Sequence, residues 1–445
     1  MNGINELAEI IGQVSAADPA VRDKLKLHVA DTVCAWIAAT TTPEGKALIA
    51  FRNRLRGPSQ SGASGLPEDL ATHCALARLS EIDDIHLKSM TTPGSVVVAA
   101  AITLASAWPE AAMDDITAAM LAGYEAMIRL GLAIKGPTVL YRGIWPTYFA
   151  SGFATAAVVA RLLRLDRAQT AQALALALTT AAPSVGQHHG ATTARWFSVG
   201  NAARNGLTAA LAAQSGFTAD VDILQSRLFP EVFGIEPDIS AMIGDRTPAF
   251  LDLSLKPWCA ARQTMPATQA LREILAASIT ADSITGITAA VLPPHLKMID
   301  HGVKAGDRAS YLTSLPYQMA IAALQPEQLA DLNQTDGIPP ASLQAFMARV
   351  KVVADDGLLA DYPATWPAHV VVTTSQARHE RRVDHIPGDP ARAFTEVELA
   401  RKFEHFVAPA AGAESAALLR SALAALDSRD ALNALKQKLD RVMLV

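Results

Sequence analysis

The chain has 445 residues, of which 50% are hydrophobic and 18% are charged, and its formal net charge is -5. This length exceeds one compact core, so two or three domains are expected. The net negative charge, the lack of any Lys- and Arg-rich block and the lack of an apolar stretch of about 20 residues exclude nucleic acid and membranes as expected partners.

Up to about residue 245, apolar positions recur at intervals of three and four residues, which predicts one helix after another. The predicted helices are Val21–Ala38, Glu68–Leu79, Ser95–Trp108, Met113–Ile134, Tyr148–Leu163, Arg167–Ala181, Gly200–Gln214 and Ile223–Leu228. Ala-rich helices with few charges pack on several sides, as in a helical core or an oligomer interface. At least a homodimer is therefore expected.

The pattern changes after residue 250. Strands are predicted at the β-branched runs Ile284–Leu292, Val350–Val353 and Val370–Thr374. Helices are predicted at Met265–Ala277 and at Leu312–Leu324, where Pro316 marks the first turn. Amphipathic helices then return at Glu396–Phe406, Glu414–Leu426 and Arg429–Leu444. The expected fold is mainly α, with a large all-helical domain (residues 1–250 and 396–445) and a smaller inserted α+β domain (residues 251–395).

Three cysteines, Cys34, Cys74 and Cys259, show neither a Cys-x-x-Cys motif nor Cys/His ligand spacing. A disulfide framework and a structural zinc site are therefore not expected, and a reducing cytoplasm suits the chain. The segment Met1–Gln13 lacks the basic start and apolar core of a signal peptide, so no export signal is expected.

The densest polar segment is Ser80–Ser95, directly before the apolar run Val96–Ala107. It holds three carboxylates, a histidine and a lysine. Its last three residues, Pro-Gly-Ser, predict a helix start whose free backbone N–H groups point at whatever the loop holds. The loop is interpreted either as part of a site or as an acidic loop with a Ser cap on a core helix.

His86 is the candidate acid or base of this loop. It follows Asp83 and Asp84, and these carboxylates would hold its imidazole protonated or select one tautomer. The alternative is a loop histidine without a role.

Four further polar clusters lie at the ends of predicted elements: Tyr141–Tyr148, Gln187–Trp196, Lys256–Gln263 and Tyr311–Tyr317. An enzyme that acts on a small polycarboxylate needs cations and hydroxyls for the carboxylates, together with an acid and a base for a proton on carbon. The clusters contain each of these residue types.

Arg142, Arg195 and Arg262 are candidates for forked hydrogen bonds to carboxylates, whereas Arg204 lies within a predicted helix and is interpreted as a surface charge. Lys256 is flanked by apolar residues and is interpreted as a buried acid or base.

Several cofactor classes lack their usual motifs. The His188-His189 pair has no further ligands at metal-binding spacing, so no metal is expected. No Gly-x-Gly-x-x-Gly follows a strand, and neither a Walker phosphate loop nor a Gly-x-Ser-x-Gly elbow is present. The remaining class is cofactor-free proton transfer next to a carboxylate or carbonyl.

Five short motifs together resemble the MmgE/PrpD family over nearly the whole chain. They are the acidic loop with His-Leu-Lys-Ser-Met and Pro-Gly-Ser, Trp145-Pro-Thr147 before an Ala-rich helix, Gly200-Asn-Ala-Ala-Arg-Asn-Gly206, Lys256 with Cys259, and Tyr317 followed by Gln-Met-Ala-Ile-Ala. The family includes 2-methylcitrate dehydratase, cis-aconitate decarboxylase and iminodisuccinate epimerase. The resemblance implies a large all-helical domain, a smaller α+β lid and an active site between them.

The resemblance also implies roles for single residues. Asp84, Lys256 and Tyr317 match positions that line the family's active site. The hypothesis is that Lys256 and Tyr317 are the two proton-transfer groups, acting from opposite sides, while Asp84 orients His86 or Lys256.

Four positions depart from the family pattern. Glu81 stands where an Asp is usual, and Arg195 stands where a Lys is usual. Thr92 and Trp145 stand where dehydratases and decarboxylases have histidines. A dehydratase must protonate a departing hydroxyl and a decarboxylase must give a proton to a new carbanion, so both assignments lose support. Epimerisation needs only one group to remove the α-proton and another to return it.

The predicted protein is therefore an isomerase like iminodisuccinate epimerase, acting on a small di- or tricarboxylate without a cofactor. The residues expected to bind substrate are Arg195, Arg142, Thr92, Trp145, Tyr148, Arg262, Gln263 and Glu81. One alternative is a lyase of the 2-methylcitrate dehydratase or cis-aconitate decarboxylase type. Another is a non-catalytic carboxylate-binding or scaffold protein.

Overall fold

The computed structural model describes residues 3–56, 65–181, 192–277, 279–333 and 337–443. They form two compact units. The helical unit comprises Met1–Gly186, Thr193–Leu255 and Glu396–Val445, and the α+β unit comprises Lys256–Thr395. The predicted mainly α fold with a smaller α+β part is confirmed.

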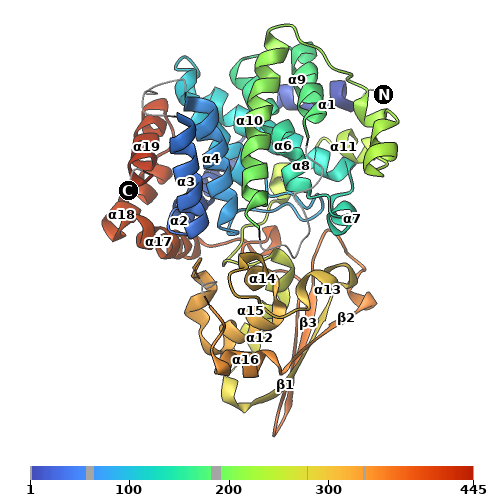
Figure 1. Ribbon diagram of the computed structural model, residues 1–445, viewed down its shortest axis with the longest axis vertical. Helices are drawn as coiled ribbons and strands as arrows, with labels where there is room; N and C mark the ends of the chain where they lie inside the picture. The colour runs from blue at the N-terminus through green and yellow to red at the C-terminus, as the bar shows by residue number, and fades with distance from the viewer. Residues whose placement is uncertain (1–2, 57–64, 182–191, 278, 334–336, 444–445) are drawn as a thin grey trace. The chain divides into compact units, whose positions relative to one another are not determined.

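Helix α10 is the centre of the helical unit, because it packs against α4, α8 and α9 (Figure 1). The first part of the unit holds α1 (Gly3–Gln13), α2 (Pro19–Ala39), α3 (Pro43–Arg56), α4 (Leu66–Leu79), α5 (Gly94–Leu104), α6 (Met113–Ala133), α7 (Gly136–Val139), α8 (Pro146–Leu162), α9 (Arg167–Thr179), α10 (Ala194–Gln214) and α11 (Ile239–Ile243). Every residue of α5 is buried, in agreement with its uninterrupted apolar sequence.

One predicted helix is wrong. Only Ile223–Gln225 forms a single 3-10 turn where a helix over Ile223–Leu228 was expected. The Ser226 hydroxyl donates to the Ile223 carbonyl at 2.7 Å and accepts from the Leu228 N–H at 3.3 Å. The serine side chain thus makes the hydrogen bonds that would otherwise continue the helix.

Among the described helices, α6 alone has the length and apolar composition of a membrane span. It is buried in the helical unit, where it packs against α8. Core helices of globular proteins show the same properties, so this helix does not indicate a membrane protein.

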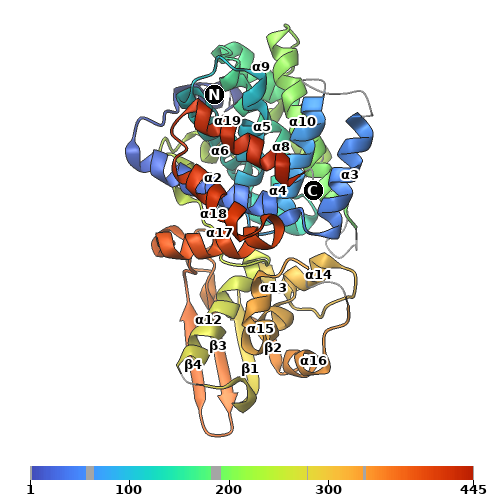
Figure 2. The same ribbon diagram turned by 90° about the vertical axis from the view of Figure 1, so that its left-hand side faces the viewer.

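The α+β unit is built on a four-stranded sheet with the order β2-β1-β3-β4. Its elements are α12 (Met265–Ala276), β1 (Ile284–Val291), α13 (Pro293–Ile299), α14 (Arg308–Thr313), α15 (Leu315–Leu324), α16 (Ala341–Met347), β2 (Val350–Ala354), β3 (Ala368–Thr374) and β4 (Arg378–Val383). Strand β1 is parallel to β2 and antiparallel to β3, and β3 is antiparallel to β4. Helix α12 covers β3 and β4, and α15 contacts β2 (Figure 2).

The last three helices, α17 (Glu396–Ala411), α18 (Ala413–Ala424) and α19 (Arg429–Val442), belong to the helical unit. In Figure 2 they lie in red over α2 and α5, and α17 packs on α2. The ammonium of Lys402 on α17 donates to the Asp31 carboxylate of α2 and, at 2.9 Å, to the Ile82 carbonyl. Both charged side chains are buried, so each depends on the other for its charge partner.

We predict that Lys402→Met lowers the free energy of unfolding by about 3–5 kcal/mol, because it leaves a buried carboxylate without its cation. Urea unfolding at neutral pH measures this loss. The matched control is Lys438→Met on α19, whose side chain is partly exposed. A loss in Lys402→Met no larger than in Lys438→Met would show that the buried pair contributes nothing.

Candidate active site

The acidic loop between α4 and α5 is buried from Ser80 to Ser95, except for Lys88. Arg78, at the end of α4, lies 2.8 Å from the Glu81 carboxylate and 3.2 Å from that of Asp83. Glu81 has a φ of 57°, in the left-handed region that non-glycine residues seldom adopt. Buried carboxylates need such a partner, and the strained turn places two of them on one guanidinium.

Asp84 is bound on both carboxylate oxygens within the helical unit. His28 Nδ1 lies 2.8 Å from Oδ2, and the Tyr124 hydroxyl donates to the same oxygen at 3.1 Å. The Gly94 N–H, the first of α5, donates to Oδ1 at 2.8 Å. A Cβ on Gly94 would lie 2.7 Å from Oδ2, so only glycine allows this approach. The anion at the start of α5 is therefore the protein's own Asp84, and its partners are His28 and Tyr124 rather than His86.

His86 is oriented by a serine. Its Nδ1 accepts from the Ser89 N–H at 3.2 Å and lies 2.9 Å from the Ser89 hydroxyl. Burial lowers the pKa of His86 to about 4, although Asp252 and Asp84 oppose this shift. Near pH 7 the ring is neutral, and because Nδ1 accepts, Nε2 carries the proton. Of the two alternatives for His86, these contacts favour a neutral ring in one tautomer, and Ser89 rather than a carboxylate selects it.

Trp145, Tyr148 and Arg195 meet where α8 and α10 begin. The Trp145 and Tyr148 rings stack with centroids 5.5 Å apart. The Arg195 guanidinium carbon lies 4.9 Å from the centroid of the Trp145 ring, in cation–π contact. The Tyr148 hydroxyl is buried and has no hydrogen-bond partner among the described residues. Burial raises the pKa of Tyr148, while Arg78 and Arg195 counteract the shift. The phenol therefore stays protonated and can donate to an anion.

Close helix packing sets this geometry. A Cβ on Gly206 of α10 would lie only 2.2 Å from the Gly152 carbonyl of α8, so the two helices can approach this closely only with glycine there. Arg195, the second residue of α10, lies over Trp145 at the start of α8 in this arrangement. The Gly-rich motif of α10 thus serves the site through packing.

Thr92 and Thr147 join the acidic loop to the start of α8. The Thr92 N–H donates to the Thr147 hydroxyl at 3.0 Å, and the two hydroxyl oxygens are 3.1 Å apart. Neither side chain titrates in the range where an imidazole would. The helical unit therefore brings together Glu81, Thr92, Trp145, Tyr148 and Arg195 of the predicted site, with Arg78 and Thr147 as additions.

Two further arginines of the helical unit, Arg142 and Arg204, differ in exposure. Arg142 is exposed, and its Nη1 donates to the Gly234 carbonyl at 2.8 Å. Arg204 is half-buried on α10. The His188-His189 pair lies outside the described residues.

Lys256 and Tyr317 both belong to the α+β unit, and both are buried. The segment that Lys256 opens contacts α14 and the 3-10 turn Pro326–Ala330, because the Ala261 N–H donates to the Leu312 carbonyl and the Cys259 N–H donates to that of Leu329. Burial raises the pKa of Tyr317, and Cys259 is among the groups that add to the shift. Tyr317 therefore lies close to this segment, and its phenol stays protonated.

Arg262 is paired inside the α+β unit. Its Nη2 lies 2.9 and 2.8 Å from the two oxygens of Asp389, and its guanidinium carbon lies 5.7 Å from the Trp366 ring centroid. Gln263, next to it, is buried. The expected carboxylate partner of Arg262 is thus an aspartate of the same unit.

Sequence reasoning missed Arg78, His28 and Asp389, which pair with the predicted residues. His28 and Asp389 are 56 and 127 residues from their partners Asp84 and Arg262, so no local spacing marks them. The one local signal was Arg78, a cation at the end of an apolar helix directly before three carboxylates. Among the described residues, no three His, Cys, Asp or Glu side chains are placed to share a metal ion.

Two family models match the chain in succession. The MmgE/PrpD N-terminal domain matches residues 5–238, and the MmgE/PrpD C-terminal domain matches residues 258–428. The chain belongs to the MmgE/PrpD family. The resemblance predicted from the motifs is therefore confirmed.

Two curated relatives of this MmgE/PrpD protein are cis-aconitate decarboxylases, one of Aspergillus terreus and one of Aspergillus terreus strain NIH 2624 / FGSC A1156. Each is 27% identical to the chain over 235 residues, which are 49% of this chain and 47% of the relative. The chain thus spans about half the length of the curated relatives it matches.

We predict that the protein loses stability as the pH falls below about 6.5, because His86 and His295 stay neutral when folded. Burial lowers the pKa of His86 to about 4 and that of His295 to about 3. The unfolded chain takes up these protons near pH 6.5, so each histidine costs roughly 1.4 kcal/mol per pH unit down to its folded pKa. Urea unfolding at about pH 7 and about pH 5 measures the slope.

The variant His295→Leu should reduce the slope of stability against pH by roughly 1.4 kcal/mol per pH unit, which corresponds to one proton. His405→Leu, at an exposed position, should leave the slope unchanged. Equal slopes in the wild type and His295→Leu would contradict the assignment.

Proposed function

We propose that this MmgE/PrpD protein is an enzyme that moves a proton on the carbon next to a carboxylate of a small di- or tricarboxylate. The specific reaction proposed is epimerisation of an iminodisuccinate-like substrate. The observation that carries the proposal is the group of Arg195, Trp145 and Tyr148, in which a guanidinium lies over an indole next to a buried phenol that has no hydrogen-bond partner among the described residues.

This group is suited to a carboxylate. An arginine held over an aromatic face keeps its planar N–H donors fixed, so little freedom is lost when they bind both oxygens. A buried hydroxyl without a hydrogen bond is costly, and a carboxylate oxygen would satisfy it. The Tyr148 phenol and the Arg195 guanidinium are thus matched donors for one anion.

Lys256 and Tyr317 are the proposed proton-transfer pair. Lys256 removes the α-proton, and the electron pair of the broken C–H bond passes into the carboxylate as an enolate. Tyr317 returns a proton to the opposite face, and each group recovers its own proton state by exchange with water. The raised pKa of Tyr317 supports its role as the proton donor, since the protonated phenol is the form that donates.

The contacts of Thr92 and Trp145 favour epimerisation over lyase chemistry. Thr92 is hydrogen-bonded to Thr147, and Trp145 is in contact with Arg195. Neither offers an acid that could protonate a departing hydroxyl near neutral pH. An epimerase needs no such acid, because no group leaves the substrate.

A decarboxylase is the second candidate, because the curated relatives bear the name cis-aconitate decarboxylase. In that reaction carbon dioxide leaves, and one residue gives a proton to the carbanion. Tyr317 could supply that proton in either reaction. The two reactions therefore differ in what leaves the α-carbon, a proton in epimerisation and carbon dioxide in decarboxylation.

The deciding experiment incubates the protein with iminodisuccinate in deuterium oxide. We predict that deuterium enters the α-carbon and that the optical purity of the substrate falls. Carbon dioxide from cis-aconitate would instead establish the decarboxylase, and water loss from 2-methylcitrate would establish the dehydratase. No turnover of any of the three would contradict the proposal and favour the non-catalytic alternative.

Lys256→Met and Tyr317→Phe should each lower turnover at least about a hundredfold, because each removes one proton-transfer group. The controls are Lys297→Met, at an exposed position of the same unit, and Tyr311→Phe, whose ring lies 5.1 Å from that of Tyr317. Near-normal turnover in either test variant would remove that residue from the mechanism.

Arg195→Met should lower kcat/KM by about 10- to 100-fold, since a hydrogen bond to a charged group contributes about 1.5–3 kcal/mol. Arg195→Lys should recover part of the loss, because it restores the positive charge but not the two parallel N–H donors of the guanidinium. Arg204→Met, on the same helix, is the control. Unchanged kinetics in Arg195→Met would contradict the carboxylate assignment.

A further inference from the structure

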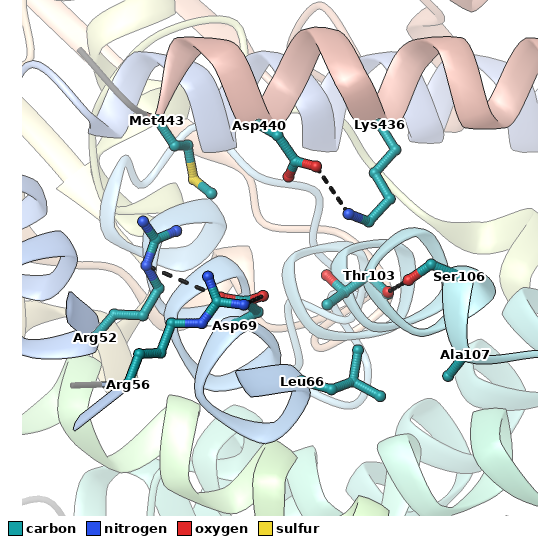
Figure 3. Close-up of a pocket in the computed structure, with 10 residues that line it drawn as sticks. All are labelled: Arg52, Arg56, Leu66, Asp69, Thr103, Ser106, Ala107, Lys436, Asp440 and Met443. Carbon is teal, nitrogen blue, oxygen red and sulfur yellow. Dashed lines mark hydrogen bonds and ion pairs between the residues drawn. The ribbon is translucent and has the colours of Figure 1, made fainter. Parts of the chain in front are cut away.

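A cavity of about 450 Å³ lies inside the helical unit, between α3, α4, the end of α5 and α19 (Figure 3). Its volume is in the range of small-molecule sites. The proposed reaction uses none of the residues around it.

Three cations surround this cavity. Arg52 and Arg56 come from α3, and Lys436 comes from α19 on the opposite side (Figure 3). Among the described residues, two carboxylates line it, those of Asp69 and Asp440. The lining therefore has one positive charge in excess.

Each of the three cations has a partner, since Lys436 Nζ lies 2.9 Å from the Asp440 carboxylate, but one arginine donor remains. Arg56 Nη2 lies 3.0 Å from Asp69, but its Nε is buried and has no hydrogen-bond partner among the described residues. Arg52 Nε lies 3.9 Å from Asp69, beyond hydrogen-bond distance, and Arg52 Nε and Nη2 instead donate to the side-chain oxygen of its neighbour Asn53 at 3.2 and 3.1 Å. Burial lowers the pKa of Arg52, with Arg56 adding to the shift and Asp69 opposing it. A bound anion would relieve both the desolvation and the repulsion.

A buried histidine next to the lining, His73, adds no charge to the cavity. His73 Nδ1 lies 2.8 Å from the hydroxyl of Thr103, which lines the cavity, and His73 Nε2 has no hydrogen-bond partner among the described residues. Burial and then Arg52, Lys436 and Arg56 lower the pKa of His73 well below its usual value, so the ring is neutral. The remaining lining is apolar or weakly polar, including Leu66 and Met443.

The cavity is separate from the candidate active site. Asp69 is near the start of α4 and Arg78 is near its end, so about 13 Å of helix lies between them. Likewise, Thr103 is at the end of α5, whereas Gly94 begins that helix. The two sites are at opposite ends of the same two helices.

We propose that this cavity binds a small organic anion with phosphate or carboxylate groups, held between the two arginines of α3 and Lys436 of α19. The apolar side chains would contact its carbon skeleton. The excess positive charge, the Arg56 Nε that has no partner among the described residues, and the volume of the cavity together favour an oxyanion of charge -1 or more over a neutral ligand.

The test uses Ser106, an exposed residue of the cavity wall. The three natural cysteines are buried, so in S106C the introduced thiol is the accessible one. Its alkylation by iodoacetamide is measured with inorganic phosphate, with citrate, or with chloride at equal ionic strength. Phosphate or citrate should slow alkylation, by about tenfold at ten times the dissociation constant. The anion with the lower half-protecting concentration identifies the head group.

Adding Lys436→Met should weaken this protection, whereas adding Lys438→Met, two residues away on α19, should not. The same anion should raise the Tm of the unmodified protein. Protection by chloride equal to that by phosphate and citrate, or equal protection with and without Lys436, would overturn the proposal. Alkylation and melting do not depend on turnover, so this result is independent of the proposed reaction.

Discussion

The helical unit depends on pairing every carboxylate that it buries. The acidic loop lies within a mostly apolar core, where an unpaired charge would be far costlier than the stability of a typical domain allows. Arg78 pairs Glu81 and Asp83, while Asp84 takes hydrogen bonds from His28, Tyr124 and the first N–H of α5. These partners come from four separate helices. The loop therefore ties the unit together, and its conformation is fixed before any ligand arrives.

This rigidity explains why the carboxylate-binding group can be well formed. Arg195 and Trp145 are held by the close crossing of α8 and α10, and Thr92 is fixed to the start of α8 by Thr147. In a preorganised site, orienting the donors costs little free energy when substrate binds. His86 fits the same description, since its neutral ring is locked by Ser89 and offers one N–H.

Apolar periodicity predicted most long elements, because burial selects the residues of α6, α8 and β1. It missed β4, whose sequence Arg-His-Glu-Arg-Arg-Val is mostly exposed and which pairs through its backbone with β3 alone. It also missed α3, which buries only Gly45 and Arg52. Residue type suggested the candidate site residues, but it did not reveal the partners that hold them. Whether Asp84 faces His28 or His86 depends on contacts between distant segments, which no local pattern records.

The pairing of Lys402 with Asp31 joins positions 371 residues apart. During synthesis, α2 leaves the ribosome long before α17 exists, and at ordinary elongation rates the interval is on the order of tens of seconds. Throughout that time the aspartate lacks its cation and the apolar surface beneath α17 is uncovered. The nascent amino-terminal helices are thus an incomplete folding unit that stays vulnerable to aggregation, and a chaperone would find its substrate there rather than in the finished protein.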